Sequence, residues 1–175
     1  KVPGDSVKIR LVSDATNAEW GFGVTGIKEY QPDGWSFFDG DTHYYIGGWL
    51  LRGECFVGGA WRYFEPELGA MQTGLVTLPS GVVKYYDENG LRVTGFVHLS
   101  DGSRYFDADT GTMATGLTYL PDGRVIYCGT NGVLRSGTFT FKGEKLHFNN
   151  NGVLDDPATT SIPAGTIAEE DGGPA

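Results

Sequence analysis

Aromatic residues are the groups in this chain whose type and spacing best suit the binding of a ligand. They recur as adjacent pairs, which are Tyr63-Phe64, Tyr85-Tyr86 and Tyr105-Phe106, with Tyr127-Cys128 in the same role further on. Aromatic rings pack on the apolar faces of ligands and attract cations to their π faces. Because adjacent residues of a strand point to opposite sides, we expect one member of each pair in the core, and the sequence leaves open which one.

Two pairs of carboxylates, Glu65 with Glu67 and Asp107 with Asp109, have the residue types of a glycosidase, which needs two acids about 5 to 10 Å apart in a cleft. Each pair lies between an aromatic pair and a glycine, where acidic residues commonly stabilise turns. Calcium at Asp107 and Asp109 is the other chemistry open to them, but no known calcium-loop signature surrounds them. We expect a protein that is not an enzyme and has no metal and no cofactor.

The histidines and cysteines show no spacing typical of a metal site or a nucleophile. His43, His98 and His147 share no common phase, and Cys55 and Cys128 match no zinc or redox motif. No Ser-His-Asp order, phosphate-binding loop or dinucleotide motif is present either. We therefore expect both thiols to be free.

The charge balance limits the kind of partner. The net charge of -9 argues against a nucleic-acid binder or a protein held on anionic lipid, because both need a basic face. No apolar stretch approaches the roughly 18 residues that span a bilayer, so membrane insertion is not expected. A neutral or cationic partner fits better.

The elements that carry the aromatic pairs repeat every 21 residues. One series of glycines at this spacing is Gly53, Gly74, Gly95, Gly116 and Gly137. A second is Gly48, Gly69, Gly90, Gly111 and Gly132, and a third is Gly81, Gly102 and Gly123. Three series with one period indicate a repeat architecture.

Each repeat is expected to be a β-hairpin. Residues 74–78 and 82–87 have strand character, and glycine-containing turns follow each of them at Gly81 and Gly90. A hairpin of this size is marginal in water, so it must stack on its neighbours. The sequence therefore predicts an all-β solenoid of stacked β-hairpins.

This pattern also predicts the domain limits. The solenoid is expected over residues 26–155, with a degraded first repeat between Gly26 and Arg52. Residues 1–25, which contain a strand-like segment over 7–12, are expected to be a cap or the end of a preceding segment. Residues 156–175 have the acidic, Pro- and Gly-rich composition of a tail or linker.

Three segments carry a more specific signal. They are Gly59-Ala60-Trp61-Arg62-Tyr63-Phe64, Gly69-Ala70-Met71-Gln72-Thr73-Gly74 and Gly111-Thr112-Met113-Ala114-Thr115-Gly116. A period near 20 residues, an aromatic strand and a Met-x-Thr-Gly ending together resemble the choline-binding or cell-wall-binding repeats, which have relatives in glucan-binding glucansucrases and clostridial toxins. The resemblance covers at most residues 26–155.

The resemblance implies ligand sites between consecutive repeats, lined by aromatic residues and often a methionine. The positions that match the family's pattern are Trp61, Tyr63, Met71, Tyr85, Tyr105, Met113 and Tyr127. Most cage tryptophans are missing, because their positions carry Val83, Ser103, Val125, Leu75, Phe96 and Leu117. Since a quaternary ammonium needs several ring faces, we expect the ligand to be a sugar rather than choline. For each of these rings and methionines, a place in the core is the alternative.

The function that the resemblance implies is that of a non-catalytic carbohydrate- or cell-wall-binding module. Its partner would be a bacterial wall polymer, a glucan or a host glycan, and the module would anchor or target a larger secreted bacterial protein at the cell surface. Weak sites suit such a polymer, because repetition raises avidity. The alternative is a structural or adhesive stalk without a small-molecule ligand, which could also form a homodimer.

Overall fold

The computed structural model describes residues 31–155, and every regular element in this part of the chain is a β-strand. The strands are β1 (Gly34–Phe38), β2 (Asp41–Ile46), β3 (Trp49–Leu50), β4 (Gly53–Val57), β5 (Ala60–Phe64), β6 (Gly74–Thr77), β7 (Val83–Tyr86), β8 (Arg92–Val93), β9 (Gly95–Leu99), β10 (Gly102–Phe106), β11 (Gly116–Tyr119), β12 (Val125–Cys128), β13 (Gly137–Phe141) and β14 (Glu144–Phe148). The all-β prediction is confirmed. The predicted cap, the strand over 7–12 and the tail lie outside the described residues.

The strands pair as antiparallel hairpins in chain order. β6 pairs with β7, β9 with β10, β11 with β12 and β13 with β14, and β4 and β5 form a further two-stranded sheet. The turn predicted at Gly81 is present, with φ at +86°, a conformation that L residues rarely adopt. Glycine there lets β6 reverse into β7 within a few residues. The predicted architecture of repeated hairpins is thus confirmed. Among the described residues, no helix is long and apolar enough to span a membrane.

The described chain divides into two compact units. The first contains residues up to Cys55 together with Phe64–Met71, and the second contains Phe56–Tyr63 and everything from Gln72 onward. In the first unit, β1, β2 and β3 form one sheet, and the buried ring of His43 lies with Nδ1 2.9 Å from the carbonyl oxygen of Gly69. This contact ties the sheet to the Phe64–Met71 segment.

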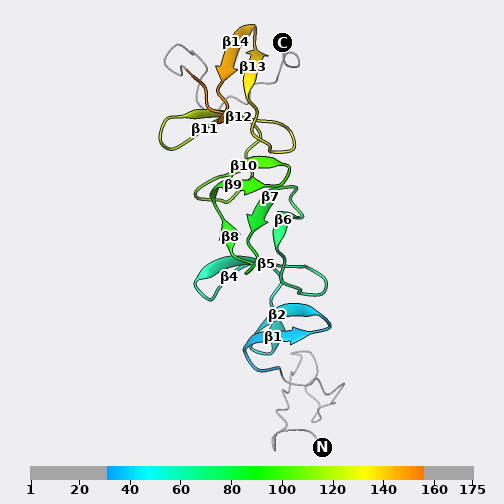
Figure 1. Cartoon of the computed structure of the whole chain (residues 1–175). Helices are drawn as coiled ribbons and strands as arrows, with labels where there is room; N and C mark the ends of the chain where they lie inside the picture. Colours follow the sequence, from blue (N-terminus) through cyan, green and yellow to red (C-terminus); the bar gives the residue numbers. More distant parts are fainter. Residues whose placement is uncertain (1–30, 156–175) are drawn as a thin grey trace, which may run out of the picture. The chain divides into compact units, whose positions relative to one another are not determined.

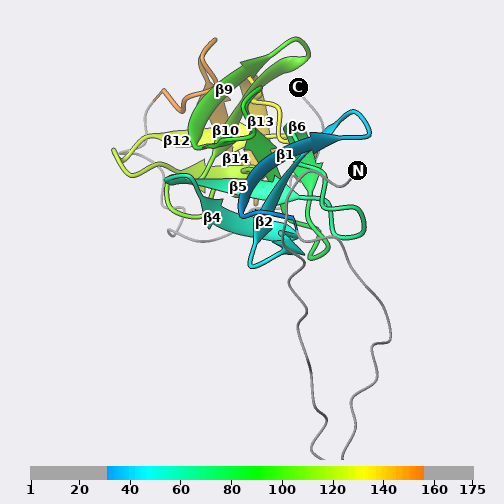
Figure 2. The same cartoon turned by 90° about the horizontal axis from the view of Figure 1, so that it is seen from below.

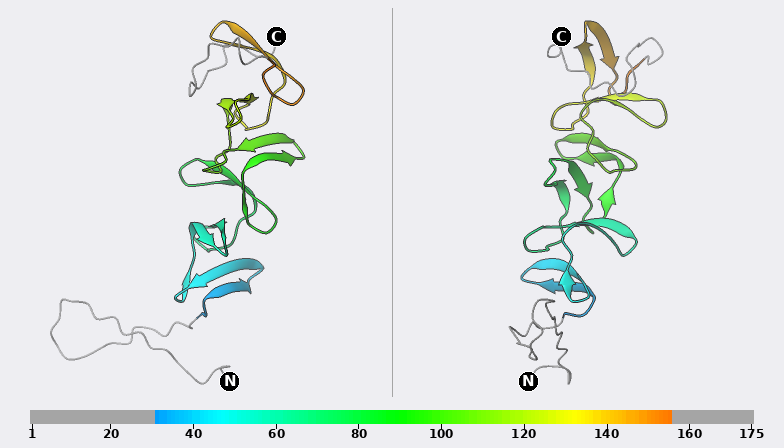
Figure 3. Two further views of the ribbon diagram at one scale, coloured as in Figure 1. Left: turned by 90° about the vertical axis from the view of Figure 1, so that its left-hand side faces the viewer. Right: turned by 180° about the vertical axis from the view of Figure 1, so that it is seen from behind.

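The second unit is a series of stacked hairpins, which can be followed in order from β6 to β14 (Figure 1) and from two further sides (Figure 3). Viewed from below, the hairpins β9–β10 and β11–β12 point in different directions (Figure 2). The core lies between consecutive hairpins. One cluster joins Tyr105 to Leu120, Ile126 and Cys128, so residues of successive repeats share it.

The aromatic pairs are more deeply buried than we expected. Tyr63, Tyr105 and Tyr127 are buried together with the residue that follows each of them, and only Tyr85 stays half-buried beside a buried Tyr86. Tyr127, for example, contacts Phe139, Phe141 and Phe148 of the next hairpin. Both sides of a hairpin are therefore covered, because a neighbour packs on the face that a lone hairpin would expose.

The second glycine series has a packing role within this stack. A Cβ atom on Gly132 would lie 2.3 Å from Sδ of Met113, and one on Gly111 would lie 2.8 Å from Cδ of Arg92. Both glycines also have positive φ, at +77° and +70°. Each therefore lets the backbone pass directly over a side chain of the preceding repeat, which explains why glycine recurs with the repeat period.

Candidate functional site

The seven residues predicted to bind a ligand have very different exposures. Trp61 is 40% exposed, Met71, Tyr85 and Met113 are half-buried, and Tyr63, Tyr105 and Tyr127 are buried. The three buried tyrosines offer a ligand little of their rings, although Tyr105 still lines one of the cavities described below. Trp61 is the predicted residue with the most accessible ring, and its surroundings define the first candidate site.

Trp61 lies in an aromatic and cationic cluster of the second unit. Its ring contacts the exposed ring of Phe56 edge to face, with 5.6 Å between the centroids. The guanidinium carbon of Arg92 lies 5.4 Å from the centroid of the Trp61 ring, which is within cation–π range. A positive group of the protein itself therefore lies on this ring.

Arg92 occupies a special place in the repeat. It lies 21 residues after Met71 and 21 before Met113, at the position that these repeats fill with methionine. Its guanidinium donates to the carbonyl oxygens of Thr110 and Asp109, at 3.2 Å each, and these bonds hold it in place. The next repeat thus fixes the cation over Trp61, where a cationic ligand would otherwise find a ring face.

We predict that Arg92→Met gives the chain a measurable response to quaternary ammonium. Tetramethylammonium chloride should change the tryptophan fluorescence of the variant. The apparent affinity of the variant for this cation should be roughly two- to fivefold above that of the wild type, because a cation–π contact contributes about 0.5–1 kcal/mol. Sodium chloride corrects for ionic strength, and Lys145→Met, which removes an exposed positive charge of β14 outside the candidate sites, is the matched control. Identical titrations of Arg92→Met and wild type would contradict the prediction.

A second candidate site is a groove of about 470 Å³ in the second unit. An aromatic ring, Phe96, lies on one side of it, and Arg124 places its guanidinium carbon 5.7 Å from the centroid of that ring. The other lining residues are His98, Gly102, Ser103, Val133, Leu134, Arg135, Ser136, Asn150, Asn151, Gly152 and Val153. They come from three successive repeats, so the groove exists only in the stacked structure.

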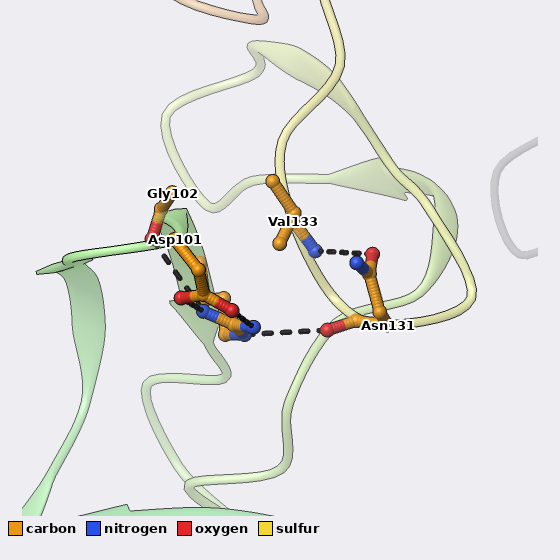
Figure 4. Close-up of polar contacts among 5 residues, drawn as sticks. Asp101, Gly102, Asn131 and Val133 are labelled. Carbon is orange, nitrogen blue, oxygen red and sulfur yellow. Dashed lines mark hydrogen bonds and ion pairs between the residues drawn. The ribbon is translucent and has the colours of Figure 1, made fainter.

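Polar contacts join the turn at Asp101 and Gly102 to the loop at Asn131 and Val133 (Figure 4), and Gly102 and Val133 both line the groove. Arg104, which is 4% exposed, forms two 2.7 Å bonds to the two carboxylate oxygens of Asp101 and donates to the carbonyl oxygen of Asn131 at 3.2 Å. A Cβ on the adjacent Gly102 would lie 2.6 Å from a methyl group of Val133. The β9–β10 hairpin is thus held closely against the loop of the following repeat.

A third candidate site, more open and of about 610 Å³, contains two of the predicted residues, Tyr105 and Met113. Asp107, Thr110 and Tyr119 also line it, with further threonines. Burial, followed by the nearby carboxylate of Asp107, raises the pKa of Tyr105. The phenol therefore stays protonated near neutral pH and keeps its donor hydrogen.

The carboxylate pairs serve turns, as predicted. Glu65 accepts the backbone N–H groups of Glu67 and Leu68, and Asp107 accepts those of Asp109 and Thr110. These backbone hydrogen bonds hold the pKa of Glu65 and of Asp107 below the usual range. A general acid needs a raised pKa, so neither residue is tuned for glycoside hydrolysis.

The thiols are free, as expected. Burial raises the pKa of Cys128 to about 11, so this thiol is inert within the core, and burial also raises the pKa of the more accessible Cys55. Among residues 31–155 no three acidic, histidine or cysteine side chains form a cluster that could hold a metal ion.

Sequence reasoning missed the arginines. Arg92, Arg124 and Arg135 line or cover the candidate sites, but no arginine was among the predicted residues. The signal for Arg92 was present, because it stands in phase with the two methionines. Arg124 and Arg135 carry no comparable signal, since their approach to Phe96 and the groove depends on how three repeats stack.

Solved structures confirm the fold. Choline binding protein F from Streptococcus pneumoniae is 27% identical over 71% of this chain, with a TM-score of 0.64, and CbpJ from Streptococcus pneumoniae TIGR4 is 25% identical over 70%, with the same TM-score. The matches span only 41% and 45% of those two proteins. No protein-family model and no curated protein matches the chain.

The similarity in fold and the sequence motifs point to the same kind of repeat. The motifs are the aromatic strand at Trp61 and the Met-x-Thr-Gly endings at Met71 and Met113. The positions that the cage tryptophans would occupy carry other residues, and Trp61 and Phe96 each have an arginine of this chain on the ring. In fold and repeat motif, the chain resembles the β-hairpin repeats of choline-binding proteins, and most positions of the cage tryptophans carry other residues.

Proposed function

We propose that this chain is a non-catalytic, carbohydrate- or cell-wall-binding repeat module that anchors or targets a larger secreted bacterial protein. The observation that supports it best is the groove beside Phe96, which combines an exposed ring with side chains that can bond sugar hydroxyls, among them Ser103, Asn150 and Asn151. A ring with a few polar groups around it is the usual composition of a sugar site. The partner would be a bacterial wall polymer, a glucan or a host glycan.

The repeat architecture favours a polymer over a small molecule. The groove beside Phe96 and the more open site beside Tyr105 belong to neighbouring repeats of one unit. Two weak sites on one chain can engage two residues of the same glycan and raise avidity by about 100-fold or more. Such a module acts outside the cell, at the surface that displays the polymer.

The domain limits remain part of the proposal. The repeats would extend over residues 26–155, with residues 1–25 as a cap or the end of a preceding segment and residues 156–175 as a linker. The chain's short match to choline binding protein F, 41% of that protein, fits a module within a larger whole.

Glycan profiling tests the function. The purified chain should bind selectively to members of a panel of wall polymers, α-glucans, host glycans and choline, and Phe96→Ala or Trp61→Ala should weaken the response roughly tenfold, the effect of losing one well-placed ring. Phe37→Ala, which removes a ring that is 74% exposed in the first unit, is the matched control. A folded chain that binds none of these glycans would overturn the proposal.

A structural or adhesive stalk is the second candidate, and two observations favour it. The rings of Tyr63, Tyr105 and Tyr127 are buried, as a spacer without ligand requires. The first unit also exposes large apolar side chains, among them Phe37 and Trp49. A stalk that pairs through them would sediment as a dimer, and charged substitutions at Phe37 and Trp49 would return it to a monomer.

A further inference from the structure

The groove beside Phe96 has a charge opposite to that of the whole protein. Its lining includes two arginines, Arg124 and Arg135, together with His98, and it includes no carboxylate. The full chain carries a net charge of -9, so a groove lined by basic residues differs in charge from the protein as a whole. A cationic ligand such as choline would meet guanidinium groups here.

The two arginines have different roles. Arg124 is fixed, because it lies over the Phe96 ring and forms a 2.7 Å ion pair with Asp122, which neutralises much of its charge. Arg135 is exposed, and within residues 31–155 it makes no ion pair with a carboxylate. Arg135 therefore supplies the positive charge that the groove can offer to a ligand.

The remaining polar side chains are neutral and suit a sugar. Asn150, Asn151 and Ser136 line the same groove as Arg135, and all three are exposed. A guanidinium binds a carboxylate or phosphate through a planar pair of N–H donors, and such charge-assisted bonds are about twice as strong as neutral ones. The amide and hydroxyl groups can bond the neighbouring hydroxyls of the same sugar.

We propose that this groove binds an anionic sugar unit, with Arg135 pairing its carboxylate or phosphate and Phe96 contacting the face of the sugar ring. This inference rests on the proposed function and names its ligand class. It reverses the charge that a choline cage selects, because the groove is lined by Arg124 and Arg135 and by no carboxylate. The repeats keep their stacked grooves and select an anion in place of a quaternary ammonium.

A pair of probes that differ only in charge tests the proposal. A trisaccharide of galacturonic acid should bind roughly tenfold tighter than its neutral methyl ester at low ionic strength, and the ratio should shrink in high salt. Arg135→Gln should remove the difference between acid and ester. Lys145→Gln, which removes an exposed charge of β14 outside the groove, should leave it unchanged.

Glycerol phosphate in parallel distinguishes the source of the charge. Stronger Arg135-dependent binding of the phosphate than of the acid trisaccharide would assign the groove to a phosphate-bearing wall polymer, and the reverse would assign it to a uronic-acid glycan. Equal binding of acid and ester overturns the anion inference while leaving the sugar-binding function intact. No binding of any of these probes, in a chain that binds neutral glycans elsewhere, also overturns the inference, whereas failure with every glycan overturns both proposals.

Discussion

Gly132→Ala is expected to destabilise the second unit by about 2–4 kcal/mol. Two costs add at this position. Its φ of +77° disfavours any residue with a Cβ by about 1 kcal/mol, and the new methyl group would lie 2.3 Å from Sδ and 2.8 Å from Cγ of Met113. Because Cγ is near the root of the side chain, Met113 cannot relieve the clash by moving its tip alone. Overpacking of this kind costs about 1–3 kcal/mol more.

Gly95→Ala is the matched control, because Gly95 has a φ of +81° but no heavy atom within 4 Å of an added Cβ. It should show the backbone cost of about 1 kcal/mol without the packing cost. Urea unfolding, followed by far-UV circular dichroism and by tryptophan fluorescence, measures both variants. Equal losses would mean that Met113 finds room elsewhere and that the second glycine series serves the turn alone.

The two roles of these glycines explain why the fold could be predicted from the sequence. A glycine series is visible in the sequence because it repeats in phase, and both causes of it, the turn and the close passage over the preceding repeat, are present at Gly111 and at Gly132. The turn at Gly81 and the strands on either side of it follow from local signals, so they appear within a residue or two of the predicted positions.

The burial of both members of the aromatic pairs was harder to predict from the sequence. Alternation along a strand identifies two faces, but it does not say what covers the second one. Tyr127 is buried because the rings of Phe139, Phe141 and Phe148 reach it from the next hairpin. That contact depends on the angle between hairpins, which is a property of the stack and not of any single repeat.

The same limit applies to the candidate sites. Trp61 was predicted as ligand-facing from its match to a motif, and its ring is accessible. The arginines that lie on these rings come from other repeats. Arg124 lies on Phe96 from 28 residues further along the chain, and Arg92 lies on Trp61 from 31 residues further along. The phase of Arg92 with Met71 and Met113 marks a repeat position but not a ring contact, and Arg124 has no such phase, so only the geometry shows which rings the two arginines reach.

Arg104→Met is expected to lower the stability of the second unit by about 2–3 kcal/mol. Arg104 is 4% exposed, and its guanidinium bonds both oxygens of Asp101 and the carbonyl oxygen of Asn131. Methionine keeps much of the apolar stem but leaves the carbonyl of Asn131 without its donor. The buried guanidinium and its bond to the Asn131 carbonyl set this magnitude, because the carboxylate of Asp101 is itself 62% exposed. Chemical denaturation near neutral pH measures it.

Arg124→Met is the matched control, because Arg124 also forms a 2.7 Å ion pair, with Asp122, but its side chain is 50% exposed. Water screens and replaces an exposed pair, so this variant should unfold at the same denaturant concentration as the wild type within error. Equal destabilisation by both substitutions would show that burial does not determine the strength of the Arg104 bridge.

Unfolding at low pH distinguishes the two variants, because different groups lower the pKa of Asp101 and the pKa of Asp122. The side-chain hydrogen bond from Arg104 is the main cause that lowers the pKa of Asp101 below its ordinary value of 3.8, whereas the backbone N–H of Arg124 is the main cause for Asp122. A lowered folded-state pKa gives stability that is present above the unfolded pKa and is lost as pH falls through the folded one. Arg104→Met should therefore remove the Asp101 contribution, and its stability should fall less steeply below pH 4 than that of the wild type. Arg124→Met keeps the main cause, the backbone N–H of residue 124, and loses only the smaller contributions of the guanidinium, so its decline with acid should stay closer to that of the wild type than the decline of Arg104→Met does.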